Sequence, residues 1–112
     1  FLTESFRVAA FSDNLMELDQ AVYRAGARFL VVLVPDAAQL NNPAMQNTNR
    51  VLEKLCADAK ISYLDLTPVF EKEQDVSSLY LFPVDAHTSA KGDLLIAQAV
   101  RRKIIEEGLL SP

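Results

Sequence analysis

The chain is poor in the residue types that most often mark a chemical site. Its 112 residues include one cysteine, one histidine and no tryptophan. A single cysteine excludes an internal disulfide. One histidine, one cysteine and no spaced carboxylate cluster give no support to a metal site. We therefore expect neither a bound metal nor another cofactor.

Positive charge and long apolar runs are also scarce. There are 11 Lys and Arg against 15 Asp and Glu, a net charge of −4. This balance argues against sequence-independent binding to nucleic acid, which needs an excess of Lys and Arg on one face. No apolar run reaches the roughly 18 residues of a membrane span, and no signal peptide is visible. We expect no nucleic-acid partner and no membrane span.

Half of the residues are apolar, which is enough for one globular domain. We interpret residues 1–112 as a single segment. Because the chain begins with Phe1 and not with methionine, we expect it to be part of a longer product. Cys56 falls among apolar residues at helical spacing, so we expect it to be a small buried hydrophobic residue.

Two strands and the helix between them are predicted from local patterns. The run FLVVLV, residues 29–34, is apolar on both faces, which fits a buried parallel strand. The run ISYLDL, residues 61–66, predicts a second strand. Asn42 followed by Pro43 is a typical helix start, and a helix is predicted over 43–60. A connection of this length allows the two strands to pair in parallel.

Two further helices flank this unit. One is predicted over 12–27, with Ser12 or Asp13 capping its start and Gly26 ending it. The last is predicted from Ser89 or Ala90 to about Glu107, with Gly108 as its stop. The positions that we expect to face inward are Leu15, Leu18, Val22 and Ala25 in the first helix, Thr48, Val51, Leu52, Leu55 and Ala59 in the second, and Leu94, Ala97, Val100 or Arg101, and Ile104 in the last, with Leu95 and Ile105 beside them.

The resulting order is α–β–α–β–loop–α, an α/β domain with helices on a parallel sheet. Two strands do not make a sheet with two covered faces. The stretch FRVAAF, residues 6–11, is a weak candidate for a third strand. We therefore expect the C-terminal half of a larger fold in preference to the smallest version of one.

The stretch YLFPVDAHTSAKGDLLIAQAVRRKI, residues 80–104, contains the only histidine, His87, two residues after Asp85. Residues i and i+2 of an extended segment point to the same side, and ligands collect at the carboxyl ends of parallel strands. An adjacent carboxylate can orient an imidazole that acts as a base. The spacing alone leaves open that His87 is merely an exposed or capping loop residue.

The residues after His87 indicate a built helix start. Ser89 can cap the last helix by accepting from backbone N–H groups. Gly92 then occupies the third helical position, where glycine costs about 1 kcal/mol relative to alanine. Close approach of a neighbouring backbone or side chain is one reason to tolerate it.

The block YLDLTPVF … LYLFPVDAHTSAKGDLLIAQAV resembles the C-terminal block of the SGNH (GDSL-type) hydrolases, and NLMELDQAVYRAGARFLVVLVP resembles the helix and fourth strand of that fold. The likeness covers about residues 12–107, with these matching positions: Pro35, Asp85, His87, Ser89, Gly92 and Ala97. It implies the C-terminal part of a three-layer, flavodoxin-like parallel sheet. It also implies that His87 is the catalytic base and Asp85 its orienting acid.

Two departures from the family pattern matter. The usual pair is D-x-x-H, and the D-x-H found here is associated with a branch that includes alginate O-acetylation proteins and uncharacterised bacterial members. No G-D-S block is present, and no serine has the glycine-flanked turn that exposes a nucleophile; Ser12-Asp13-Asn14 fits a helix cap better than the family's asparagine block. The resemblance therefore implies a fragment of an esterase or O-acyl hydrolase or transferase, inactive by itself. Its substrate would be a small-molecule or carbohydrate ester, and a missing N-terminal half or another chain would complete the sheet.

Two other interpretations stay open. The chain could be a non-catalytic α/β binding or scaffolding domain in which Asp85 and His87 make only loop hydrogen bonds. A receiver-like domain with Asp36 as phosphoacceptor is less favoured, because the acidic cluster and the lysine that it needs are not found, so Asp36 fits a turn residue. Asp65, at the end of the second predicted strand, fits a strand-end cap better than a site residue.

Overall fold

The structure, a computed structural model, describes residues 4–111. Its helices and strands are α1 (Glu4–Arg24), β1 (Leu30–Leu33), α2 (Asn47–Ala59), β2 (Ser62–Asp65), α3 (Thr67–Glu71) and α4 (Ala90–Glu106), with short 3-10 turns η1 (Ala37–Gln39), η2 (Pro43–Met45) and η3 (Val76–Leu79). This order confirms the predicted alternation of helices and strands. The fold is mixed α/β.

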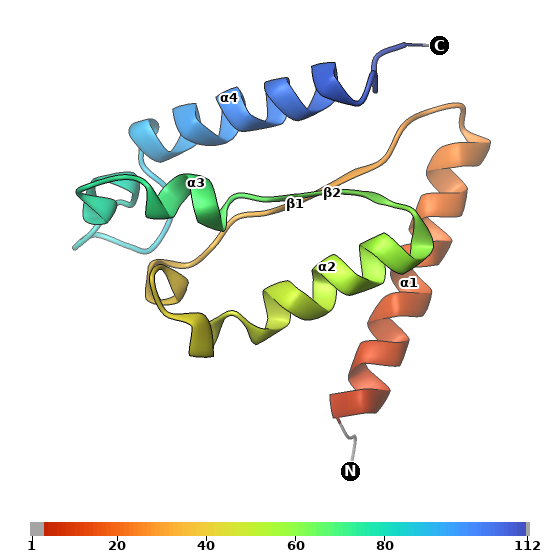
Figure 1. The fold of residues 1–112 in the computed structure, drawn as a ribbon, viewed down its shortest axis with the longest axis horizontal. Helices are drawn as coiled ribbons and strands as arrows, with labels where there is room; N and C mark the ends of the chain where they lie inside the picture. The colour runs from red at the N-terminus through yellow and green to blue at the C-terminus, as the bar shows by residue number, and fades with distance from the viewer. Residues whose placement is uncertain (1–3, 112) are drawn as a thin grey trace.

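The two strands pair in parallel, as predicted, with Leu30 opposite Ser62 and Leu33 opposite Asp65. Figure 1 shows α4 along one side of the pair and α2 along the other. The described residues form only these two strands, and every residue of both strands is half-buried. Strand β1 is therefore less covered than its apolar composition predicts, and neither outer edge of the pair is bonded to a further strand within residues 4–111.

The prediction of a strand over 6–11 is wrong, because these residues belong to α1. The predicted cap at Ser12 or Asp13 is wrong for the same reason: both residues lie in the middle of this helix, and so does Asn14. Residues 4–24 contain no glycine or proline and are rich in good helix formers, so nothing stops the helix from continuing towards the N-terminus. Gly26 ends the helix as predicted, with a left-handed φ of +77°.

Helix α2 begins at Asn47, four residues later than predicted, because Asn42 and Pro43 start the turn η2 instead. Thr48 is exposed and not inward, whereas Cys56 is fully buried as predicted. Between α1 and α2 lies an open groove of about 210 Å³, lined by Arg7, Val8, Phe11, Thr48, Val51, Leu52 and Leu55. The apolar side of α2 is thus only partly covered.

Helix α4 has the predicted start and stop, with Ser89 at its N-cap and Gly108 in the left-handed conformation after its end. Its buried face agrees with the prediction only in part. Leu95, Val100 and Ile104 are half-buried as predicted. Leu94 is 57% exposed and Ala97 is exposed, whereas Ala99 is buried and Ile96 is half-buried, and neither of these two was predicted to face inward.

The core lies at the end of the molecule where both strands end. It consists of Leu40, Leu66, Phe70, Leu79, Tyr80 and Ala99. Cys56 and Ile61 are also buried, but the molecule as a whole is open: its accessible surface is 7848 Å² for 12.4 kDa, against about 6,100 Å² for a compact monomer of that mass. Its radius of gyration is 15.6 Å, where about 13 Å is typical for this length.

Within residues 4–111, none of the helices combines the length and the apolar character that crossing a membrane requires.

Candidate functional site

The segment that contains Asp85 and His87 is a short antiparallel hairpin. The Leu81 amide donates to the His87 carbonyl at 2.8 Å, and the Ser89 amide donates to the Leu79 carbonyl at 2.9 Å. Between these two bonds, Tyr80 and Thr88 form an antiparallel bridge. We call residues 79–89 the hairpin. It lies beside α3, at the end of the molecule where β1 and β2 end (Figure 1).

The structure brings the two predicted site residues together. Asp85 Oδ1 accepts from the backbone N–H of His87 at 2.8 Å and lies 3.1 Å from His87 Nδ1. An ionised Asp85 favours the proton on Nδ1 and leaves Nε2 as a free acceptor. This is the tautomer that a general base needs. The contact is observed, and the catalytic roles of both residues stay a prediction.

The carboxyl group of Asp85 is held in its ionised form. Its pKa is lowered, chiefly by the hydrogen bond from the His87 backbone N–H. Slight desolvation works against this, while the hydrogen bond and the charge of the His87 ring lower the pKa further. Asp85 is therefore a carboxylate at neutral pH.

The pair is open to solvent. The side chain of His87 is 87% exposed and that of Asp85 is 45% exposed. Water screens a contact of this kind, so it contributes little to stability. The apolar residues of the hairpin tip are exposed as well: Leu81, Phe82 and Val84. Within the described residues, the surroundings of His87 are therefore open to water and do not enclose a reacting group.

The hairpin is joined firmly to the start of α4. Ser89 Oγ accepts from the Gly92 N–H at 3.2 Å and donates to the Ser78 carbonyl at 2.6 Å. Gly92 is buried, and a Cβ on it would overlap the carbonyl oxygen of Leu79. Both the predicted cap and the predicted close approach are confirmed.

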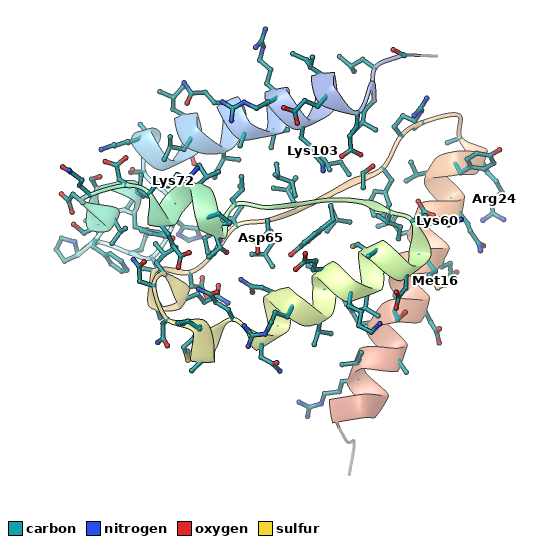
Figure 2. The ribbon with its side chains drawn as sticks, in the orientation of Figure 1. Met16, Arg24, Lys60, Asp65, Lys72 and Lys103 are labelled. Carbon is teal, nitrogen blue, oxygen red and sulfur yellow. The ribbon has the colours of Figure 1, made fainter. Side chains whose placement is uncertain are left out.

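The other candidate residues have structural partners. Asp65 Oδ1 accepts from the Thr67 N–H at 2.9 Å, which confirms the strand-end cap; Figure 2 shows Asp65 between the strands and α2. Cys56 is fully buried, and burial raises the pKa of its thiol. Among residues 4–111, no three His, Cys, Asp or Glu side chains are placed to share a metal ion.

Two polar features near the strand ends were not predicted. The Tyr80 hydroxyl donates to the Pro35 carbonyl at 2.7 Å. Asn49 is 4% exposed; it donates to Thr67 Oγ1 at 3.2 Å and accepts from Gln39 Nε2 at 3.1 Å. Of these two features, only the burial of Asn49 had a signal in the sequence: this polar residue lies one helical turn from Leu52 and two turns from Cys56.

No family model, no curated protein and no solved structure matches this chain. The likeness to the SGNH hydrolases therefore depends on the quoted residues alone. The geometry around Asp85, His87, Ser89 and Gly92 is the material from which a function must be argued.

Proposed function

We propose that the chain supplies the acid–base half of an SGNH-type esterase or O-acyltransferase site, with His87 as the base and Asp85 as its orienting acid. One observation carries the proposal: Asp85 Oδ1 lies 3.1 Å from His87 Nδ1, on a hairpin at the carboxyl end of a parallel strand pair. This is the edge of an α/β sheet at which ligands collect.

The reaction needs a hydroxyl nucleophile that residues 1–112 do not supply. His87 Nε2 takes the proton of that hydroxyl as its oxygen attacks the acyl carbon of the ester. The imidazolium then returns the proton to the leaving alcohol, while the Asp85 carboxylate stabilises the cation. Water, or a second alcohol in a transferase, releases the acyl group by the same steps. General acid–base catalysis of this kind contributes about 10²- to 10⁴-fold.

In this proposal the nucleophile and the oxyanion donors belong to polypeptide that covers the open side of the strands, either an N-terminal half or another chain. Two observations support such a cover. Strand β1 is only half-buried although all four of its residues are apolar. The chain's surface of 7848 Å² exceeds that of a compact monomer by about 1,700 Å², an area typical of extensive, stable interfaces. The completed fold would be the three-layer, flavodoxin-like sheet.

The test uses a polypeptide that contains residues 1–112 together with the nucleophile, assayed on p-nitrophenyl acetate. His87→Ala should lower kcat by about 10³-fold or more, and Asp85→Asn by a smaller factor. Asp58→Asn is the matched control, since Asp58 contacts only Lys54 on the exposed face of α2; it should leave kcat unchanged.

A fluorophosphonate probe separates the proposal from the alternative. It should label one serine outside residues 1–112 and none within them. Unchanged turnover in His87→Ala would refute the catalytic role. Absence of any labelled serine in the longer polypeptide would favour the binding or scaffolding interpretation, in which the pair only shapes the hairpin.

A further inference from the structure

Tyr80 connects two parts of the chain that are distant in sequence. Its side chain is 4% exposed, and its hydroxyl donates to the carbonyl of Pro35, two residues after β1, at 2.7 Å. Its ring packs edge-on against Phe70, with 6.0 Å between the ring centres. Burial and the nearby charge of Asp36 raise the pKa of Tyr80 to about 12, so the phenol stays protonated and continues to donate.

Tyr80 is also part of the hairpin that contains His87. It forms the antiparallel bridge with Thr88, and the next amide, that of Leu81, donates to the His87 carbonyl at 2.8 Å. By contrast, residues 81–87 are all exposed. The bond from Tyr80 to Pro35 therefore joins the exposed part of the hairpin to the end of β1 through a buried residue.

We propose that Tyr80 is a positioning residue whose hydroxyl holds the hairpin, and with it His87, at a fixed place against the carboxyl end of β1. The purpose of this placement depends on the proposed function, since a base must lie within hydrogen-bond reach of the proton that it takes. A misplacement of about 1 Å can cost 10²-fold in rate. The contact with Asp85 sets the tautomer of His87, and Tyr80 sets the position of the imidazole relative to the end of β1.

The substitution Tyr80→Phe removes the hydroxyl and keeps the ring. NMR of the chain itself provides two local readouts. Amide hydrogen exchange should accelerate at Leu81 by at least tenfold more than at amides in the middle of α4. The ring ¹⁵N shifts of His87, which are unambiguous because it is the only histidine, should keep the Nδ1–H form, because the Asp85 contact that sets this tautomer lies within the hairpin. A purely structural role would change exchange at both places by the same factor, and that result would overturn the proposal.

Tyr23→Phe is the matched control. Tyr23 is 81% exposed on α1, so the same change there should leave both readouts unaltered. If Tyr80→Phe does not fold, exchange of the Leu81 amide in the unsubstituted chain still tests the proposal. If the Leu81 amide already exchanges as fast as an unstructured one, no fixed hairpin exists and the proposal fails.

The two proposals can fail separately. In a polypeptide that also contains the nucleophile, Tyr80→Phe should lower kcat by tenfold or more with KM changed by less than twofold. If His87→Ala leaves turnover intact, the catalytic proposal fails while the NMR readouts still decide the role of Tyr80. If His87→Ala abolishes turnover and Tyr80→Phe changes neither kcat nor the exchange of the Leu81 amide, only the positioning role fails.

Discussion

Gly92→Ala is the sharpest test of how the hairpin packs on α4. From helix propensity alone, alanine at a helical position should stabilise the chain by about 1 kcal/mol relative to glycine. The structure predicts the opposite sign. An added Cβ would overlap the carbonyl oxygen of Leu79, and backbone at this point cannot move as a flexible side chain would.

The magnitude follows from what must shift. Forcing an extra carbon into a packed site costs about 1–3 kcal/mol. Moving Leu79 also weakens its bond from the Ser89 amide, 2.9 Å long, which contributes about 1 kcal/mol. Subtracting the gain in helix propensity leaves a loss of about 1–3 kcal/mol. This is a large part of the 5–15 kcal/mol that typically holds a domain together.

Urea unfolding followed by circular dichroism measures this loss directly. Gly26→Ala is the informative control, because Gly26 has φ +77° but nothing within 4 Å of an added Cβ. Its cost is backbone strain alone, about 1–2 kcal/mol, and it should leave the hairpin amides unchanged. Gly92→Ala should instead accelerate exchange of the Ser89 amide beyond its effect on overall stability. Equal or greater stability of Gly92→Ala would refute the close approach.

Three further predictions concern single groups. The lowered pKa of Asp85 means that its ionised form adds stability above the pKa of the unfolded chain, near 4, and that this contribution is lost as pH falls through the folded pKa. A ¹³C titration of its carboxyl group should show that the pKa stays lowered, though by less, in His87→Ala, since the backbone N–H of residue 87 is the largest single cause. Asn49→Ala should cost about 1–3 kcal/mol in urea unfolding, because it leaves the buried Thr67 hydroxyl without its donor. Cys56 should react with a thiol reagent only as the chain unfolds, since it is fully buried.

Each of these has a clear contrary result. An ordinary Asp85 pKa would mean that the turn from Asp85 to His87 does not form in solution. An Asn49→Ala variant as stable as the exposed control Asn47→Ala would mean that the buried hydrogen bonds contribute nothing. Rapid modification of Cys56 without denaturant would contradict the packing of α2 on β2.

The elements with strong local signals were predicted correctly. Strand β1 is a short apolar run with two valines, β2 is a short run that stops before Thr67-Pro68, and both occur where expected. Helix α4 starts at a serine cap and stops at a glycine, two signals that act within one turn of the chain. The hydrogen bond between Asp85 and His87 is local as well, because the two residues are only two positions apart.

The wrong predictions each have a physical cause. A Ser-Asp-Asn sequence favours a helix start only if the residues before it are not helical, and the residues before Ser12 include the good helix formers Arg7, Ala9 and Ala10 and no glycine or proline. In α4, Leu94, Leu95 and Ile96 are consecutive, so more than half of the helix circumference is apolar and the period does not identify one face. Packing decides instead, through the approach of Leu79 to Gly92.

The bond from Tyr80 to Pro35 spans 45 residues, and no local pattern encodes such a contact. It exists because the core gathers at the strand ends, where α3, η3 and α4 meet. Both strands are only half-buried, and several large apolar side chains of α1 stay exposed. The apolar side chains of the molecule are thus covered unevenly, with close packing at the strand ends and an open side elsewhere.

This unevenness limits what can complete the site. A histidine that is 87% exposed is fully hydrated, whereas a working base acts in a site from which most water is excluded. A polypeptide that binds only the groove between α1 and α2 would cover apolar surface without reaching the strand ends. One that pairs with the free edge of β1 extends the sheet beside Pro35, to which Tyr80 holds the hairpin. Under the proposed function, therefore, burial of β1 and burial of His87 must occur together.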